Sequence, residues 1–276
     1  MLVFPPCKIN LGLKILRKRA DGFHDLETLF YPIPLCDALE IGDAEEVDGE
    51  TAHLWQDGLP VAGETKNNLI LKAYRLLAQD YDLKPVQFCL LKTIPMGAGL
   101  GGGSSDGAYA IRLLNEYFNL NISLEKQLNY AAQLGSDCAF FIYNQPCFGS
   151  ARGEILEPSE FSLNKYWLAL IKPNIHISTA QAFANIIPCE FEAGMDLKQI
   201  IEMPIETWKE HLKNDFEESL FPSFPELKFI KEYLYNQGAV YAAMSGSGST
   251  VFGLFRSEPK LEKTNPDYFY WEGKLS

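Results

Sequence analysis

The most informative part of the sequence is Pro95-Met96-Gly97-Ala98-Gly99-Leu100-Gly101-Gly102-Gly103-Ser104-Ser105, which carries five glycines within seven residues. Glycine has no Cβ atom, so this backbone can approach a ligand closely. Ile111, Leu114 and Phe118 then recur at helical spacing. A helix N-terminus offers amide hydrogens and a partial positive charge, and both attract phosphate groups. The stretch therefore predicts a phosphate-binding loop that leads into a helix from about Ser105 to Phe118.

Two other phosphate-binding motifs fit this stretch less well. Gly97, Gly99 and Gly102 satisfy the Gly-x-Gly-x-x-Gly pattern of dinucleotide-binding folds, but that pattern belongs in a first βαβ unit and here begins only at residue 97. The acidic residue that should close the next strand would fall near residues 121–125, in a predicted loop and helix start. A Walker A loop needs a lysine, and this stretch has none. The hypothesis that the protein is a nicotinamide-dependent dehydrogenase thus rests on the glycine pattern alone. Failure to bind NAD would exclude this hypothesis.

Composition and charge narrow the class of protein. The chain has 276 residues, of which 47% are hydrophobic and 22% charged, as is usual for a globular enzyme. Lys and Arg number 24 against 36 Asp and Glu, a net charge of −12 that repels nucleic acid over long range. A phosphate site must therefore be built locally. Six scattered cysteines without a CxxC pair favour reduced thiols. We expect a soluble, cytoplasmic protein without a membrane span, acting as a monomer or weak homodimer.

An N-terminal hairpin is predicted from strict alternation. Ile9, Leu11, Leu13 and Ile15 point to one side of a strand, and Lys8, Asn10, Gly12 and Lys14 point to the other. Asp21-Gly22 reads as the turn, because both residue types accept positive φ. The return strand is expected from about Phe23 to Phe30. This hairpin puts Lys8 and Asn10 on its polar face.

Periodicity and capping residues predict the remaining elements, which mix without regular βαβ alternation and indicate an α+β fold. The expected elements are a helix capped by Asn67 or Asn68, a strand over Val86–Leu91, a helix capped by Ser123 and ended by a left-handed Gly135, a strand over Cys138–Tyr143, a strand over Trp167–Ile171, a helix from Thr179, a helix over Pro225–Asn236, and a strand pair around Gly246–Gly248. The polar region from Gly149 to Ser162 suggests a boundary between domains at 1–155 and 156–276.

Four segments together resemble one protein family. The glycine stretch resembles the central phosphate loop of GHMP kinases, such as galactokinase, homoserine kinase and mevalonate kinase. The segments Cys7–Leu11 with Arg19–His24, Leu134–Cys138 and Met244–Gly248 resemble, in order, the signatures of the branch that phosphorylates a methylerythritol carrying a cytidine diphosphate. The matches span nearly the whole chain. Small departures include Ser136 and Cys138 beside Asp137, and Phe23 in place of a frequent tyrosine.

The resemblance implies a fold, a cofactor and a reaction. The fold is a two-domain GHMP kinase fold, with an N-terminal ATP-binding domain and a C-terminal ferredoxin-like α/β domain. The reaction is transfer of the γ-phosphoryl group of Mg²⁺-ATP to the 2-hydroxyl of the methylerythritol moiety. Asp137 is then the candidate general base, and Lys8 the cation that orients the hydroxyl or neutralises charge.

The resemblance also implies ligand-binding residues. The backbone of Pro95–Ser105 should hold the ATP phosphates, with Asn68 and Lys92 at the nucleoside end, and Ser104 or Ser105 as a weak candidate Mg²⁺ ligand. At the cytidine end, Phe23 and Phe183 are candidate stacking surfaces and His24 a contact to the base edge. Asn10, Thr179 and Gly246 are candidate contacts to the rest of the substrate. The basic run Arg17-Lys18-Arg19 is interpreted as a solvated turn in preference to a diphosphate site.

Two alternatives stay open within this family. One is a GHMP kinase for another small alcohol, such as homoserine or mevalonate. The Asp21–His24 hairpin argues against it, because a small substrate needs no aromatic platform. The other is a non-catalytic sensor with the same fold, which would have no need of Lys8 and Asp137 together.

Overall fold

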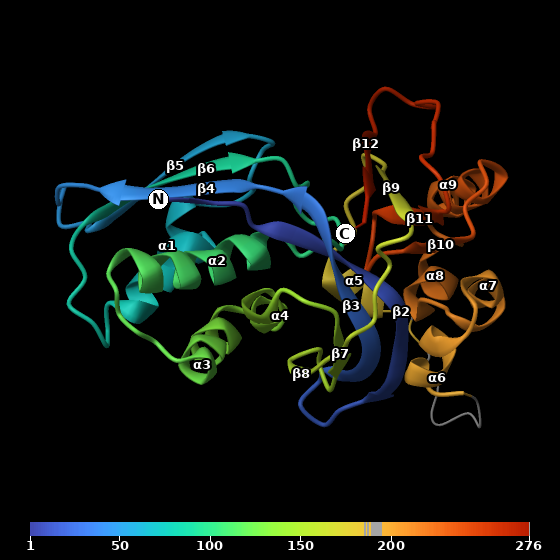
Figure 1. Ribbon diagram of the computed structural model, residues 1–276, viewed down its shortest axis with the longest axis horizontal. Coiled ribbons are helices and arrows are strands. Elements are labelled where there is room, and N and C mark those ends of the chain that lie inside the picture. Colours follow the sequence, from blue (N-terminus) through green and yellow to red (C-terminus); the bar gives the residue numbers. More distant parts are fainter. Residues whose placement is uncertain (185, 187, 189–194, 276) are drawn as a thin grey trace. The chain divides into compact units, whose positions relative to one another are not determined.

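The computed structural model describes residues 1–184, 186, 188 and 195–275, in which helices and strands mix as in an α+β protein (Figure 1). The chain divides into two compact units. Unit 1 comprises Met1–Cys7, Leu35–Met96 and Gly101–Gln145, and unit 2 comprises Lys8–Pro34, Gly97–Leu100 and Pro146–Ser276. The two units therefore interleave along the sequence. The predicted domain division at 155/156 stays a prediction.

Unit 1 is a four-stranded sheet covered by helices. The strands β1 (Leu2–Val3), β4 (Ala38–Asp43), β6 (Val86–Lys92) and β5 (Ala52–Gly58) lie in that order. β5 runs parallel to β6, and the other neighbours are antiparallel. The helices are α1 (Leu69–Leu77), α2 (Gly102–Tyr117), α3 (Leu124–Leu134) and α4 (Cys138–Tyr143). α1 contacts β5 and α2 contacts β4, so the sheet buries the face that carries Leu39, Phe88 and Leu90.

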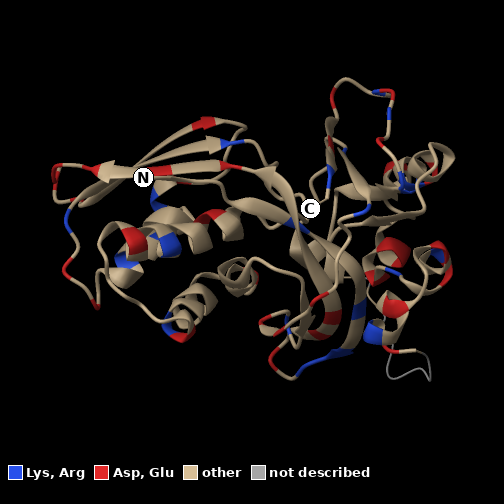
Figure 2. Cartoon of the chain, in the orientation of Figure 1, with Lys and Arg blue, Asp and Glu red and all other residues tan. Residues whose placement is uncertain are grey.

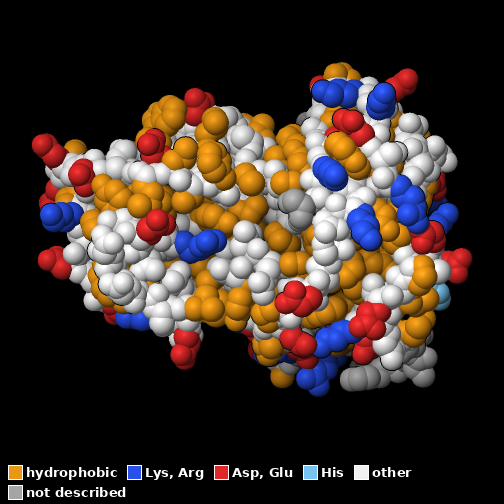
Figure 3. Space-filling view, viewed as in Figure 1, with side chains coloured by type: hydrophobic (Ala, Val, Ile, Leu, Met, Phe, Trp, Pro, Cys, Tyr) orange, Lys and Arg blue, Asp and Glu red, His pale blue; other side chains and the backbone are white. Residues whose placement is uncertain are grey.

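The other face of this sheet carries apolar side chains at the surface. Leu2, Glu40, Cys89 and Trp55 form one row across the four strands. Leu2 and Trp55 are more than half exposed. The space-filling view shows apolar side chains over this part of the surface (Figure 3).

Unit 2 contains an antiparallel sheet in the order β10 (Tyr241–Met244), β11 (Val251–Phe255), β9 (Trp167–Lys172) and β12 (Phe269–Lys274). Helix α9 (Pro225–Asn236) packs on β10 and β11. Leu227, Ile230 and Leu234 of this helix belong to a buried cluster that also contains strand residues. The apolar residues at helical spacing on α9 therefore pack against the buried face of the sheet.

A second sheet joins β2 (Pro6–Lys18), β3 (His24–Cys36), β7 (Cys147–Ser150) and β8 (Ile155–Pro158) in that order. The other described helices of unit 2 are short: α5 (Thr179–Phe183), α6 (Leu197–Glu202), the 3-10 helix η2 (Ile205–Thr207), α7 (Trp208–His211) and α8 (Asp215–Leu220). The first turn of α8 carries Asp215, Glu217 and Glu218, part of the red ribbon at that helix in Figure 2. Acidic residues suit the partial positive charge of a helix N-terminus.

Most of the predicted elements are confirmed. The N-terminal hairpin turns at Gly22, whose φ is 86°, α1 is capped by Asn68, and α3 is capped by Ser123. α9 has the predicted bounds, and the turn at residues 246–248 joins β10 to β11. Among the described residues, no helix is both long enough and apolar enough to cross a membrane.

Three predictions are wrong in detail. Cys138–Tyr143 is helix α4 and not a strand, because a short apolar run buried on all sides has no periodicity to separate the two. Gly135 has a φ of 169°, which is extended and not left-handed, and its carbonyl accepts from the amide of Cys138 as the chain turns directly into α4. Helix α2 begins at Gly102, three residues earlier than expected, so part of the glycine stretch is helical.

Candidate active site

The glycine stretch adopts a backbone that most residues avoid. Gly97, Gly99 and Gly101 have φ values of 60°, 74° and 71°, in the left-handed region. Ala98 and Leu100 between them have negative φ, since neither is among the positive-φ residues. An alternation of the two hands turns successive amides toward one concave side, which is the geometry of an anion-binding nest. Gly97, Gly99 and Gly101 are therefore needed to reach these φ values, and not only to leave room for a ligand.

Three successive carbonyl oxygens of this stretch accept hydrogen bonds from other residues of unit 2. Ala98 O accepts from Thr250 N at 3.2 Å, and Gly99 O accepts from Ser245 Oγ at 2.8 Å. Leu100 O accepts from Lys8 N at 3.0 Å. In a trans peptide the carbonyl and the following N–H point in opposite directions. The N–H groups of residues 99–101 therefore point away from these bonds, as an anion cradle requires.

Gly99 has no room for a side chain. A Cβ atom built on Gly99 would lie 2.0 Å from the carbonyl oxygen of Ser245, which is a backbone atom of unit 2. Ser245 thus holds this glycine both by its hydroxyl and by contact. Because φ at Gly99 is also positive, any other residue would be strained there.

The N-terminus of helix α2, in unit 1, can bind an anion by itself. Gly101 is its N-cap residue, and the helical bond from Ser105 N to Gly101 O measures 2.9 Å. The amides of residues 102–104 precede that bond, so they belong to the helix terminus that lacks intrahelical acceptors. A phosphate placed there would meet both amide hydrogens and the helix dipole.

The side chain of Lys92 is not placed where it could contact a nucleotide. Its side chain is fully buried, and its Nζ donates to the carboxylates of Asp37 and Asp106. Burial alone would lower the pKa of Lys92, but Asp106 and Asp37 raise it above the usual value. Burial likewise raises the pKa of Asp106 to about 7, which the ammonium of Lys92 opposes and the charge of Asp37 favours. In this conformation Lys92 offers no atom to a nucleoside, so it serves inside unit 1.

Asn68 is the N-cap of α1. Its Oδ1 accepts from Ile70 N at 2.9 Å, and its Nδ2 donates to Gln56 Oε1 at 3.2 Å. The side chain therefore stabilises the start of the helix, and its predicted contact with a nucleotide stays a prediction.

Lys8 and Asn10 lie on one face of β2, as the alternation predicts. Both are buried, and Lys8 Nζ donates to Asn10 Oδ1 at 2.6 Å. Asn10 Nδ2 donates to Thr28 Oγ1 at 3.0 Å, and the Phe30 ring centroid lies 5.1 Å from Lys8 Nζ. The ammonium of Lys8 is thus held in a defined direction by an amide and an aromatic face.

Asp137 is positioned by the turn between α3 and α4. It is the N-cap residue of α4, half-buried, directly before the buried Cys138. Burial raises the pKa of the Cys138 thiol to about 12, a hydrogen bond with Ser104 lowers it in part, and the charge of Asp137 raises it further. Cys138 is therefore a neutral thiol next to Asp137, and Asp137 itself is the residue at which α4 begins.

The aromatic residues of the predicted base platform are arranged differently from the expectation. His24 stacks on Phe183 with ring centroids 4.7 Å apart and planes at 17°, and Phe183 packs edge-on against Phe216 at 4.8 Å. Phe23 is 54% exposed and lies under the guanidinium of Arg152 at 5.0 Å. The ring partnered with Phe183 is therefore that of His24, and Phe23 presents a separate aromatic surface.

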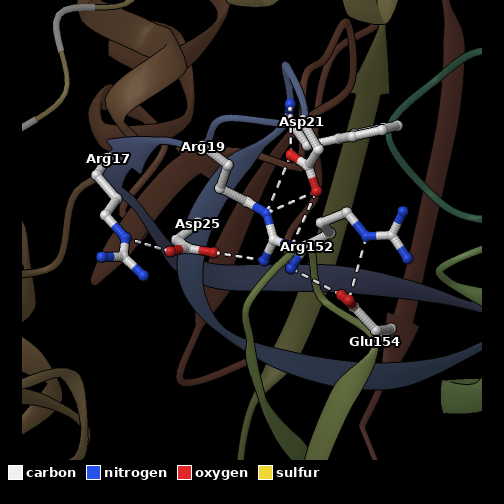
Figure 4. A network of polar contacts seen from close by, with 7 residues as sticks. Arg17, Arg19, Asp21, Asp25, Arg152 and Glu154 are labelled. Atoms are coloured by element: carbon white, nitrogen blue, oxygen red, sulfur yellow. Dashed lines mark hydrogen bonds and ion pairs between the residues drawn. The ribbon is translucent and has the colours of Figure 1, made fainter.

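The basic run at the hairpin tip is neutralised locally. Figure 4 shows Arg17 and Arg19 reaching the carboxylates of Asp25 and Asp21. Hydrogen bonds from Arg17 and Arg19 lower the pKa of Asp25. These guanidinium groups are partnered within the turn, which supports the interpretation of the run as a solvated turn rather than a diphosphate site.

The Gly246 turn rests on a residue that sequence reasoning missed. Asn214 Nδ2 donates at 2.8 Å to the carbonyls of both Met244 and Gly246, and its Oδ1 caps α8 through Phe216 N. Gly246 is buried, with φ 54°, and a Cβ there would lie 3.2 Å from Asn10 Oδ1. A lone asparagine gives no sequence signal of this role. Thr179, in contrast, is exposed as the first residue of α5.

The residues present do not form a metal cage by themselves. Among the described residues, no group of three or more His, Cys, Asp or Glu side chains could hold a metal ion. Ser105 is fully buried and its Oγ has no partner within the described part of the chain, whereas Ser104 is half-buried and contacts Cys138. Mg²⁺ usually keeps several waters and binds mainly through substrate phosphates. The site therefore fits a metal that enters with a polyphosphate, with Ser104 better exposed than Ser105.

Comparison with known proteins identifies both halves of the chain. The family model described as GHMP kinases N terminal domain matches residues 68–145, and the model described as GHMP kinases C terminal matches residues 197–264. The 4-diphosphocytidyl-2-C-methyl-D-erythritol kinase of Bacteroides fragilis is 52% identical over 263 residues, which cover 95% of each chain. The protein of the same name from Bacteroides thetaiotaomicron is 50% identical over 277 residues and covers 100% of each chain.

Solved structures agree in fold. A crystal structure of 4-(cytidine 5'-diphospho)-2C-methyl-D-erythritol kinase matches with a TM-score of 0.81 at 28% identity, covering 100% of this chain and 99% of that chain. Homoserine kinase from Cytophaga hutchinsonii matches with a TM-score of 0.61 at 15% identity, over 98% of this chain and 94% of that one. The second likeness concerns the fold alone.

Proposed function

This chain belongs to the GHMP kinases, in the branch of the 4-diphosphocytidyl-2-C-methyl-D-erythritol kinases, and we propose that it transfers the γ-phosphoryl group of ATP to the 2-hydroxyl of that substrate. The products are the 2-phosphate and ADP, in isoprenoid precursor biosynthesis. The observation that carries the proposal is identity of 50% over the full length of both chains with a protein of that name.

The phosphate loop supplies positioning and charge stabilisation. Amides at residues 99–101 and the first turn of α2 would receive the ATP phosphates, which need donors but no covalent chemistry from the protein. The net charge of −12 gives no long-range attraction for a nucleotide, so these local donors must supply it. Mg²⁺ would neutralise the phosphate charge when bound, with Ser104 as the candidate protein ligand.

Asp137 is the proposed general base. The acceptor oxygen forms a bond to the γ-phosphorus while the bond from that phosphorus to the β-γ bridging oxygen breaks, and the hydroxyl proton passes to the Asp137 carboxylate. Its place at the start of α4 supports this role, because the helix sets the position of the backbone that carries the carboxylate.

Lys8 is proposed to stabilise the charge that develops during transfer. Its ammonium is buried and held by Asn10 and the face of Phe30, so its direction is set before substrate arrives. A preorganised cation in a site that excludes water stabilises the transition state more than a mobile surface lysine does.

At the cytidine end, Phe23, His24 and Phe183 are proposed to bind the base. Phe23 offers an exposed ring, and the His24–Phe183 stack offers a second aromatic surface with polar ring nitrogens. Asn10, Thr179 and Gly246 stay candidate contacts to the rest of the substrate. We also propose that the protein is cytoplasmic and that it is a monomer or a weak homodimer.

A coupled ADP-release assay tests the function. Mg²⁺-ATP is offered with the diphosphocytidyl substrate, with mevalonate and with homoserine in parallel. Turnover with the first alone is expected. Turnover with another alcohol would keep the kinase chemistry and refute the substrate, and silence with all three would favour a sensor.

Two variants test the base within the same assay. Asp137→Asn should lower kcat by about 10²–10⁴-fold, the usual contribution of general-base catalysis, while ATP binds nearly as before. Asp48→Asn is the control, an exposed loop carboxylate at φ 53° where asparagine is tolerated. Substantial turnover by Asp137→Asn would refute the assignment.

A further inference from the structure

Three charged side chains are buried together in unit 1 although the proposed reaction does not use them. Lys92 Nζ donates to Asp37 Oδ2 and, at 2.7 Å, to Asp106 Oδ2. The exposed fractions of the three side chains are 0% for Lys92, 0% for Asp37 and 4% for Asp106. Charges this deeply buried cost free energy to desolvate, and their mutual attraction repays that cost only with good geometry.

The chain positions of these residues relate them to the phosphate loop. The second oxygen of Asp37, Oδ1, accepts from Thr93 N at 2.6 Å and from Ile94 N at 2.8 Å. Thr93 and Ile94 lead directly into the glycine stretch, and Asp106 directly follows it. Both ends of the loop are therefore tied, through Asp37 and Asp106, to one ammonium group.

The first residue of α2 is fitted against the same group. A Cβ atom on Gly102 would lie 2.7 Å from Ile94 Cγ2 and 3.1 Å from Lys92 Nζ. The loop exit thus packs on the loop entry and on the ammonium with no spare volume. A shift of Lys92 would move the turn that carries the first amides of the helix.

Stability alone gives a weak reason for such a cluster, since well-packed apolar residues often replace a buried ion pair without loss. Geometry gives a stronger one, because a phosphate site works only if its donors are fixed within a fraction of an ångström. We propose that Asp37, Lys92 and Asp106 form a clasp that fixes the two ends of the phosphate loop, so that all three are positioning residues for ATP. The inference rests on the proposed function of that loop.

The test separates positioning from stability with three variants. Asp106→Ala removes one of the two carboxylate acceptors of Lys92 and leaves Asp37, and Asp106→Asn keeps the size of Asp106 and one acceptor oxygen. Asp80→Asn is the control for loss of a paired carboxylate elsewhere in the unit, because Asp80 accepts a hydrogen bond from Tyr130 and pairs with Lys126 at 3.2 Å at the surface, away from the loop in sequence.

For each variant, the Kd of ATP is measured by calorimetry without the second substrate, together with both KM values, kcat and the midpoint of urea unfolding. Asp106→Ala should raise the Kd and KM of ATP about tenfold, the equivalent of one hydrogen bond to a charged group. Asp106→Asn should raise them about threefold, with the KM of the diphosphocytidyl substrate unchanged within about twofold for both variants. Asp80→Asn should leave the Kd and KM of ATP unchanged and shift the midpoint of urea unfolding only slightly, because its ion pair is exposed.

Two results would overturn the clasp: wild-type ATP affinity in Asp106→Ala, or equal loss of every parameter in Asp106→Ala and Asp80→Asn. If Asp106→Ala does not fold, Asp106→Asn carries the same comparison. If the wild type binds no ATP, the proposed function fails instead. The clasp is then tested by hydrogen exchange of the amides at residues 97–105, which should exchange faster in Asp106→Asn than in wild type, and unchanged exchange would refute it.

Discussion

At the scale of single residues, His24 shows how neighbours set the protonation state of a group proposed to bind substrate. Burial lowers its pKa below the usual value, and the charge of Lys18 lowers it further. Part of that burial comes from Phe183, whose ring stacks on the imidazole. His24 is therefore neutral at pH 7, and a neutral imidazole offers one donor and one acceptor to a base edge.

We predict that Phe183→Ala raises the pKa of His24 toward its usual value of about 6.5, because the ring would regain contact with water. An NMR titration of the imidazole measures it. Phe229→Ala, which removes a 58% exposed ring elsewhere in unit 2, is the control and should leave the titration unchanged. An unaltered pKa in Phe183→Ala would mean that Phe183 does not shield His24.

The sign of the effect on stability follows from the same shift. Between the lowered pKa in the fold and the usual value, the unfolded chain binds more protons at His24 than the folded chain does. The free energy of unfolding therefore decreases as the pH falls through this window. The loss is complete below the pKa that His24 has in the folded protein. If Phe183→Ala removes the pKa shift of His24, it should also remove this pH dependence of the free energy of unfolding.

At the scale of elements, helix α1 shows one side chain with an observed role and a predicted one. Asn68 caps the helix through Ile70 N, and it is also the candidate contact to the nucleoside. The two roles make different demands on the amide. The cap needs only an acceptor oxygen, whereas an adenine contact through the amide would need its nitrogen as well.

Two substitutions of Asn68 separate these roles. Asn68→Ala should lower the free energy of unfolding by about 1 kcal/mol, and Asn68→Asp should stay within about 0.5 kcal/mol of wild type, because aspartate caps as well as asparagine does. Urea unfolding and the Kd of ATP measure the two effects. A nucleotide contact would weaken ATP binding in both variants.

The control for this pair is the neighbouring residue. Asn67→Ala removes an exposed asparagine that does not cap α1, so it should change neither quantity. If Asn68→Ala were as stable as wild type, the cap would contribute nothing.

At the scale of the whole molecule, the interleaved units decide which pieces of the chain can fold. Leu13 and Ile15 of β2 belong to the buried cluster of unit 2, together with Phe216, Leu220 and Ile230. Ile15 N also donates to Asp215 Oδ2 at 2.7 Å. A strand near the N-terminus therefore depends on helices more than 190 residues later in the chain, as that bond between positions 200 apart shows.

We predict that a fragment of residues 1–155 does not fold stably, because the apolar face of β2 would have no cover. Circular dichroism, dye binding to exposed apolar surface and gel filtration measure this. The full chain is the control. A monomeric, cooperatively unfolding fragment would support the division at 155/156 as an independent domain boundary.

The elements with local sequence signals were predictable from the amino-acid sequence. The glycine stretch, the alternation of Lys8–Leu16, the turn at Gly22 and the caps at Asn68 and Ser123 all depend on residues within a few positions of one another. The physical reason is that backbone freedom, side-chain alternation and capping act over single turns of chain. The resemblance of four such segments was enough for the family.

Contacts between side chains far apart in the sequence became known from the folded chain. Lys92 finds Asp37 across 55 positions, and Asn214 holds Gly246 across 32. Neither pairing leaves a local pattern, because sheet order and chain crossing bring those residues together. The same reason makes Cys138–Tyr143 a helix, since an apolar run buried on all sides takes the form its neighbours allow.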